Sequence, residues 1–247
     1  MSEDNVTDGI GLLCSTAAAL GFLHTLLGPD HYLPFVAMSR AGRWSARKTA
    51  VITLLCGLGH VLSSLALGTV GIALGVGVFK LEAVEGFRGD LAAWLLLTFG
   101  LVYFAWGVRR AIRNRPHTHR HVHADGTVHT HEHMHNGEHL HAHVHDDASA
   151  RAPWMLFTIF LFGPCEPLIP LLIYPAANGP MRDVVLVAAV FGVTTLATMT
   201  AVVLLANSAL GRLQFVVGGL FARLERFSHA IAGLVVLLCG VAVKVGL

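Results

Sequence analysis

Charged residues are scarce in this sequence, and their scarcity excludes a water-soluble globular domain. Asp, Glu, Lys and Arg make up 13% of the 247 residues, against roughly 25% in an average soluble domain. The formal net charge is only +2, which is too small to indicate binding to nucleic acid. The sequence therefore predicts a protein that is surrounded by an apolar medium and has no nucleic-acid partner.

Cysteine pairs and nucleotide-binding motifs are also missing. There are four cysteines, all within apolar stretches and without CxxC spacing: Cys14, Cys56, Cys165 and Cys239. This pattern excludes a disulfide framework and a zinc ribbon. Because no glycine-rich P-loop pattern occurs, nothing indicates an ATP site. We therefore expect neither an enzymatic activity nor a prosthetic group.

Apolar residues, by contrast, make up 54% of the chain. A helix needs about 20 of them to cross a hydrocarbon core of ~30 Å. Suitable stretches occupy residues 10–34, 48–78, 91–112, 153–176, 183–207 and 229–247. The first has no basic segment before it and no cleavage site after it, so we expect it to be retained. The sequence predicts an all-α integral membrane protein with six transmembrane helices in a lipid bilayer.

Basic residues predict the orientation of these helices. Thirteen of the 17 Lys and Arg residues lie in or beside the loops that follow the first, third and fifth stretches. Loops rich in Lys and Arg face the cytoplasm, so we expect both termini to lie outside. The expected location is a plasma (inner) membrane of the bacterial type.

Two proline motifs divide the chain into related halves. The first stretch contains LLGPDHYLPFV and the fourth LFGPCEPLIPLL, and proline removes backbone donors and breaks helices. Because each half has three stretches, the second must enter the membrane from the opposite side. We therefore predict an inverted 3+3 repeat of residues 1–115 and 151–247, joined by a loop at 116–150, with helices 1 and 4 broken. The alternative is that the prolines only kink two helices.

Several polar side chains are expected at mid-membrane depth, where ionisable groups are costly and usually functional. Imidazole with carboxylate or thiolate suits Ni²⁺, Co²⁺ and Zn²⁺. We expect Glu166 to balance charge or exchange a proton, and a lone His60 has the alternative of a hydrogen bond between helices. The expected metal ligands are His24, Asp30, His31 and His60, with Cys165, Thr194 and Thr198 as further candidates.

A histidine tract with twelve histidines occupies residues 117–145. It has no periodic apolar face, which predicts no regular structure without metal. Imidazoles with an ordinary pKa of about 6.5 are mostly neutral near pH 7 and can bind metal. We expect the tract to gather, buffer or sense ions with little selectivity; the alternative is a simple linker. Its histidines are His117, His119, His121, His123, His129, His131, His133, His135, His139, His141, His143 and His145.

Taken together, these motifs resemble a known family. GFLHTLLGPDH, a second histidine in the second stretch, the histidine-rich loop and GPCEPLIP resemble the nickel/cobalt transporter superfamily, in particular its six-span efflux and urease-accessory-type members. The resemblance implies a gradient-driven transporter of Ni²⁺ or Co²⁺, with efflux the favoured direction and His24, Asp30 and His31 as ligands. The metal ion would be the substrate. A homo-oligomer or a partner subunit is left open.

Two other functions are compatible with parts of the sequence. GPCEPLIPLL also resembles the intramembrane Pro-Cys segment of membrane thiol-disulfide electron carriers. Such a relay needs one cysteine in each half, but the position in the first half that matches Cys165 holds Asp30. The second alternative is an exporter of another small ion, such as an anion. An anion would need cationic groups at mid-membrane, and we expect no Lys or Arg there.

Overall fold

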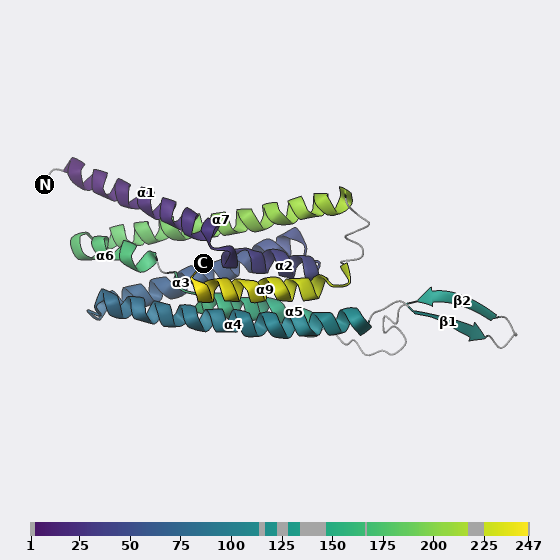
Figure 1. The fold of residues 1–247 in the computed structure, drawn as a ribbon. Helices are drawn as coiled ribbons and strands as arrows, with labels where there is room; N and C mark the ends of the chain where they lie inside the picture. The colour runs from purple at the N-terminus through teal and green to yellow at the C-terminus, as the bar shows by residue number, and fades with distance from the viewer. Residues whose placement is uncertain are drawn as a thin grey trace.

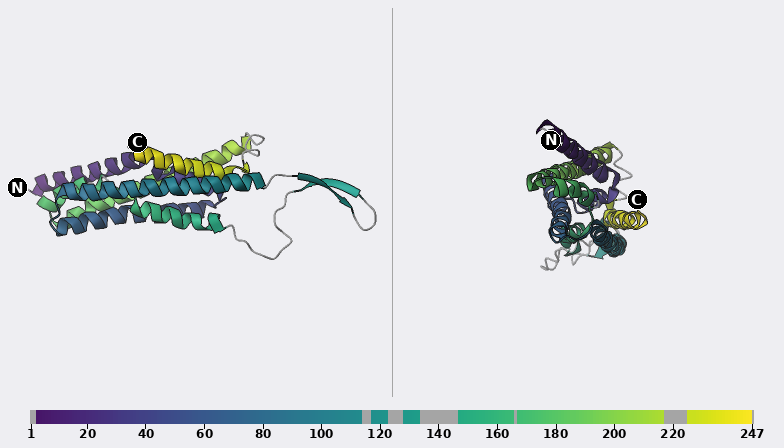
Figure 2. Two further views of the ribbon diagram at one scale, coloured as in Figure 1. Left: turned by 60° about the horizontal axis from the view of Figure 1, so that its bottom comes forward. Right: turned by 90° about the vertical axis from the view of Figure 1, so that its left-hand side faces the viewer.

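The computed structural model describes residues 3–113, 117–122, 128–133, 147–165, 167–216 and 225–246. In these residues the chain forms a bundle of long helices that lie roughly side by side, and one two-stranded hairpin lies outside the bundle (Figure 1). Two further views show the same elongated bundle from the side and from one end (Figure 2). The candidate metal ligands that the structure describes outside the histidine tract lie within the bundle.

The first half contains the interruption that the sequence predicts. Helix α1 (Glu3–Leu27) ends before Gly28, and the 3-10 turn η1 (Pro29–His31) leads into α2 (Leu33–Ala41). Pro29 has no N–H group, so it cannot continue the hydrogen bonding of α1. Pro34 lies in the first turn of α2, where a missing N–H costs nothing. The half continues with α3 (Ala46–Ala73) and α4 (Val78–Arg113).

The second half is interrupted in the same way. Helix α5 (Asp147–Phe162) is followed by non-helical backbone and then by α6 (Leu168–Asn178). Pro164 and Pro167 lie in this interruption, and neither supplies an N–H group to α5. The half is completed by α7 (Met181–Val216) and α9 (Ser228–Val245).

Four helices among the described residues are long and apolar enough to cross a membrane, compared with the six expected. They are Gly9–Leu27, Ala46–Gly71, Phe79–Arg113 and Met181–Leu213. Three apolar helices are shorter, because the fourth predicted stretch is divided between α5 and α6 and the sixth forms the 18 residues of α9. Many large apolar side chains are exposed on the bundle, Leu27 and Phe79 among them. This surface is typical of a membrane protein, whereas six spans stay a prediction.

Helices α4 and α9 are antiparallel neighbours that pack through glycine. A Cβ atom on Gly107 would overlap the backbone of His229 and Ala230, and one on Gly233 would overlap the backbone of Phe104. Gly100 and Gly240 make equally close contacts one heptad away along their helices. Small residues allow helix backbones to approach closely in apolar surroundings, so this glycine seam joins the two helices along much of α9.

The hairpin contains half of the tract's histidines and differs from the expectation of no regular structure. Strand β1 (His117–Val122) pairs antiparallel with β2 (Val128–His133), with His117 opposite His133, His119 opposite His131 and His121 opposite His129. The physical reason is that alternating HxH spacing has the period of two that belongs to a strand. The remaining histidines lie outside the described residues: His123, His135, His139, His141, His143 and His145.

Candidate metal centre

Three predicted histidines converge where the two helix interruptions meet. His24 comes from the last turn of α1, His31 from η1 and His60 from the middle of α3. The ring centroids of His24 and His31 lie 4.6 Å apart, those of His31 and His60 5.2 Å apart, and those of His24 and His60 6.4 Å apart. The three imidazoles therefore form a compact triangle.

Cys165 from the second half lies beside two of these imidazoles, those of His24 and His60. Ligand atoms of His24, His60 and Cys165 all lie within 4.8 Å of one another, and Cys165 is fully buried. In a tetrahedral site with bonds of about 2.0–2.3 Å, ligand atoms lie roughly 3.5 Å apart. Only a small inward movement would bring these three side chains onto one ion. On the sequence alone, Cys165 is a weaker candidate for a metal ligand than the three histidines and Asp30.

The imidazoles have ring nitrogens without hydrogen-bond partners among the described residues. They are Nε2 of His24, Nε2 of His31 and both ring nitrogens of His60, and all are buried. A buried polar group without a partner costs about 1–3 kcal/mol, and a bound cation or water relieves that cost. For His60 the alternative of a hydrogen bond to a neighbouring helix stays a prediction, with the backbone of Phe160 on α5 as the candidate partner.

Asp30 contacts His31 rather than the centre of the triangle. Its Oδ1 lies 3.2 Å from Nδ1 of His31, and the carbonyl oxygen of Gly28 lies 3.2 Å from the same nitrogen. When Nδ1 donates its proton to these oxygens, Nε2 is left as the metal-binding nitrogen. The expectation that Asp30 is a metal ligand stays a prediction; in the structure its carboxylate contacts His31 and lines the cavity beside the histidines.

A cavity of about 340 Å³ adjoins the cluster. His24, Asp30, His31 and His60 line it, together with apolar side chains of α4, α5 and α9. Thr194 and Thr198 of α7 are not among its lining residues. The ring centroid of His60 lies 6.2 Å from that of Phe160, which in turn lies 4.7 Å from that of Phe35. These two buried aromatic rings close the site on the side of α2 and α5.

Glycine at each interruption lets a histidine ring lie against the backbone. A Cβ atom on Gly28 would lie 2.6 Å from Nδ1 of His31, and one on Gly163 would lie 3.0 Å from Nδ1 of His60. Both distances are shorter than ordinary van der Waals contact. The Gly-Pro pair therefore does two things at each position: proline ends the helix, and glycine makes room for a histidine ring.

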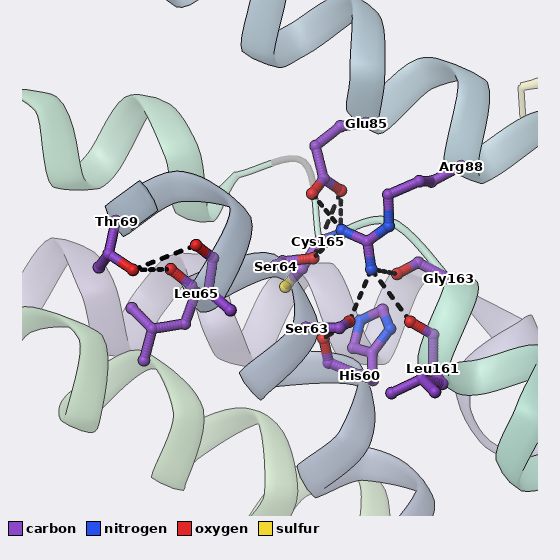
Figure 3. Close-up of polar contacts among 11 residues, drawn as sticks. His60, Ser63, Ser64, Leu65, Thr69, Glu85, Arg88, Leu161, Gly163 and Cys165 are labelled. Carbon is purple, nitrogen blue, oxygen red and sulfur yellow. Dashed lines mark hydrogen bonds and ion pairs between the residues drawn. The ribbon is translucent and has the colours of Figure 1, made fainter. Parts of the chain in front are cut away.

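Sequence reasoning missed two charged residues beside the second interruption. Glu85 and Arg88 lie three residues apart on α4 and form an ion pair that contacts the segment around Cys165 (Figure 3). The expectation of no Lys or Arg at this depth was therefore wrong, because α4 begins at Val78 rather than near residue 91. The signal in the sequence was an E-x-x-R spacing, which places both charges on one helix face.

The two remaining candidates for chemistry at this interruption are Glu166 and a thiol relay. Glu166 lies outside the described residues. All four cysteines are described and none forms a disulfide, and the ligand atoms grouped with the Cys165 thiol belong to histidines. Comparison with known protein families, curated proteins and solved structures finds no match for this chain.

Proposed function

We propose that this chain is an integral membrane transporter of a divalent transition-metal ion, with Ni²⁺ or Co²⁺ as the best-fitting substrate. The observation that carries the proposal is the convergence of His24, His31, His60 and Cys165 at the junction of two broken helices. Broken helices inside an apolar bundle are the usual setting of ion sites in secondary transporters.

The donor set favours borderline metal ions. Imidazole nitrogen and thiolate sulfur suit Ni²⁺, Co²⁺ and Zn²⁺, whereas Mg²⁺ and Ca²⁺ require oxygen ligands. The ligand atoms grouped among the described residues are nitrogen and sulfur, and the carboxylate of Asp30 contacts His31. Nickel and cobalt are preferred over zinc through the family resemblance, and the histidine-rich loop favours efflux.

The helix directions support a six-span inverted repeat as part of the proposal. In Figure 1, α1 and α5 approach the site from opposite ends of the bundle, and α3 and α7 run in opposite directions, as do α4 and α9. The continuous path α1–η1–α2 would make one span, the pair α5–α6 another, and α9 the sixth. Each member of the first half then has an inverted counterpart in the second.

Proton exchange is the proposed driving force. An imidazole that takes up a proton loses the lone pair that binds metal, so protonation on one side of the membrane releases the ion there. Asp30 would assist, because its carboxylate contacts Nδ1 of His31 and stabilises the protonated ring. The transporter would thus move metal in one direction and protons in the other.

Reconstitution in liposomes tests the function directly. Vesicles that contain a metal-sensitive dye and a pH dye are expected to show flux of Ni²⁺ and Co²⁺ with opposite proton movement, and little flux of Mg²⁺. His24→Ala is expected to abolish this flux because the variant lacks one of the proposed imidazole ligands. His229→Asn is the matched control: His229 lies at the start of α9, and its Nδ1 is 2.8 Å from the hydroxyl of Tyr103, away from the cavity.

Two outcomes would contradict the proposal. Equal flux of Mg²⁺ and Ni²⁺ would exclude a nitrogen and sulfur site. Full flux in His24→Ala would place the path elsewhere in the bundle. If no metal crosses the membrane, a thiol relay becomes the leading alternative, and loss of electron transfer in Cys165→Ser would identify it.

Replacing the histidine tract tests whether it only collects metal ions or also selects among them. We expect replacement of residues 117–145 by a Gly/Ser segment of equal length to lower the capacity or the sensitivity of transport at low metal concentration. The order of preference among Ni²⁺, Co²⁺ and Zn²⁺ should stay unchanged, because the proposed selective ligands lie in the bundle. Initial flux rates over a series of metal concentrations measure both quantities, and a new order of preference would show that the tract selects.

A further inference from the structure

The second helix interruption severs a specific backbone hydrogen bond. In an uninterrupted helix the carbonyl of Leu161 would accept the N–H of Cys165, and the carbonyl of Gly163 would face Pro167, which has no N–H. In apolar surroundings such groups cannot be left without partners. The interruption therefore needs one acceptor and at least two donors from elsewhere in the bundle.

Glu85 and Arg88 supply these groups. The N–H of Cys165 donates to Oε2 of Glu85 at 3.2 Å, and Nη2 of Arg88 donates to the carbonyl of Leu161 at 3.0 Å and to that of Gly163 at 3.4 Å. Figure 3 shows the guanidinium of Arg88 between the carboxylate of Glu85 and these two carbonyls. The ion pair thus takes the place of the severed helix bond.

The same pair reaches the helix that carries His60. Nη2 of Arg88 donates to Oγ of Ser63 at 2.6 Å, and Ser63 donates in turn to the carbonyl of His60 at 2.9 Å. The hydroxyl of Ser64 donates to Oε2 of Glu85 at 3.3 Å. One ion pair on α4 is therefore bonded both to the backbone of Cys165 and to the turn of α3 that holds His60.

Glu85 and Arg88 are both largely buried, and removing two charges from water costs free energy. The side chains of Glu85 and Arg88 are 2% and 13% exposed. Apolar residues of similar volume often stabilise a protein as well as a buried ion pair does. Ionised groups inside a membrane bundle are in addition rare and usually functional. Stability alone therefore does not account for this pair, whereas control of the backbone around Cys165 does.

We infer that Glu85 and Arg88 are positioning residues that hold the thiol of Cys165 and the ring of His60 in ligand positions. Helix α4 itself packs directly on the interruption, since a Cβ atom on Gly89 would lie 3.0 Å from Cγ of Pro164. The inference rests on the proposed function, because it assigns the pair a role in metal binding. It predicts that the pair sets the affinity and the thiolate coordination of the ion.

Cobalt binding to the purified full-length protein in detergent tests the inference. Co²⁺ bound by a thiolate shows a charge-transfer absorption band that Co²⁺ bound by imidazole alone lacks, and Cys165→Ser in the otherwise unchanged protein identifies this band. Arg88→Lys keeps the positive charge but cannot bridge Glu85, Ser63 and two carbonyls at once. We expect it to lose most of the band and to bind Co²⁺ roughly 10- to 100-fold more weakly, as supporting residues of metal sites do.

The controls separate positioning from general stability. Asp90 lies on α4, like Glu85 and Arg88, and forms an ion pair with Lys244 on α9. Asp90→Asn breaks that ion pair and should leave both the charge-transfer band and the Co²⁺ affinity unchanged. Glu85→Gln conserves shape and serves as the second variant if Arg88→Lys does not fold. In the double variant of Arg88→Lys with Cys165→Ser, the effects should add only in part, because both changes act on Cys165 while Arg88→Lys also acts on His60.

Three results decide the matter. Loss of the band in folded Arg88→Lys or Glu85→Gln supports the inference. The inference is overturned if the wild type shows the band and Arg88→Lys or Glu85→Gln shows the same band and the same Co²⁺ affinity, with only a lower melting temperature. That result leaves the proposed function standing. A wild-type protein that binds neither Co²⁺ nor Ni²⁺ overturns both.

Discussion

His60→Ala is expected to abolish saturable binding and flux of Ni²⁺ and Co²⁺ while the helical bundle stays folded. His60 is 3% exposed, and it joins His31 on one side to Cys165 on the other. Because it would supply a direct bond to the ion, its loss should weaken binding at least about 100-fold, beyond what changes in supporting residues usually cause. Isothermal titration of the purified protein and vesicle flux measure the two effects.

Thermal unfolding with and without metal provides the check on folding. A ligand at 100 times its dissociation constant stabilises the folded state by about 2.7 kcal/mol, so Ni²⁺ should raise the melting temperature of the wild type and of His229→Asn. His60→Ala should melt near the metal-free wild type and show no such rise. Its truncation removes two buried nitrogens that have no partner among the described residues, which limits the loss of stability. Wild-type affinity in this variant would refute the site.

Gly233→Leu is expected to cause the largest loss of stability. The new Cβ would overlap the backbone of Tyr103 and Phe104 on α4, and backbone cannot move aside as a flexible side chain can. Overpacking of this kind costs about 3 kcal/mol or more, which corresponds to a fall in melting temperature of roughly 10 °C in a chain of this size. Circular dichroism or fluorescence-monitored melting in detergent measures the change.

The matched control is a glycine with open surroundings on the same pair of helices. Gly86 lies on α4, and nothing lies within 4 Å of the Cβ that a substitution would add there. Gly86→Leu should therefore melt at or above the wild-type temperature, because glycine disfavours helix. Equal melting temperatures for Gly233→Leu and the wild type would show that α4 and α9 are not in backbone contact.

Local chemistry explains what the sequence predicted well. The interruptions at Gly28 and Gly163 follow from proline, whose effect on a helix needs no knowledge of the fold. The expectation that His24 and His60 lie at one level of the bundle follows from counting residues along apolar helices at 1.5 Å each, and their ring centroids lie 6.4 Å apart. Their convergence with His31 could then be expected, and the structure shows it.

Tertiary contacts explain what the sequence did not predict. On the sequence alone, Glu85 and Arg88 lie between two apolar stretches, because charged residues lower the hydropathy on which such stretches are recognised. In the fold they neutralise each other and bond to the second interruption, so α4 continues through them. In the same way, the contact between Asp30 and His31 could not be predicted from the sequence. Whether these side chains bind metal stays a prediction.

The cluster draws its donors from both halves of the chain, and this division links access to affinity. Nitrogen comes from α1, η1 and α3, whereas sulfur comes from the interruption between α5 and α6. If the proposed transporter works by rocking of one half against the other, Sγ of Cys165 would move relative to the imidazoles of the first half, and the bonds from Glu85 and Arg88 to the segment around Cys165 would resist that movement. In the proposed transporter, a site built in this way would bind the ion more weakly in the same movement that opens it, so opening and release would be one event.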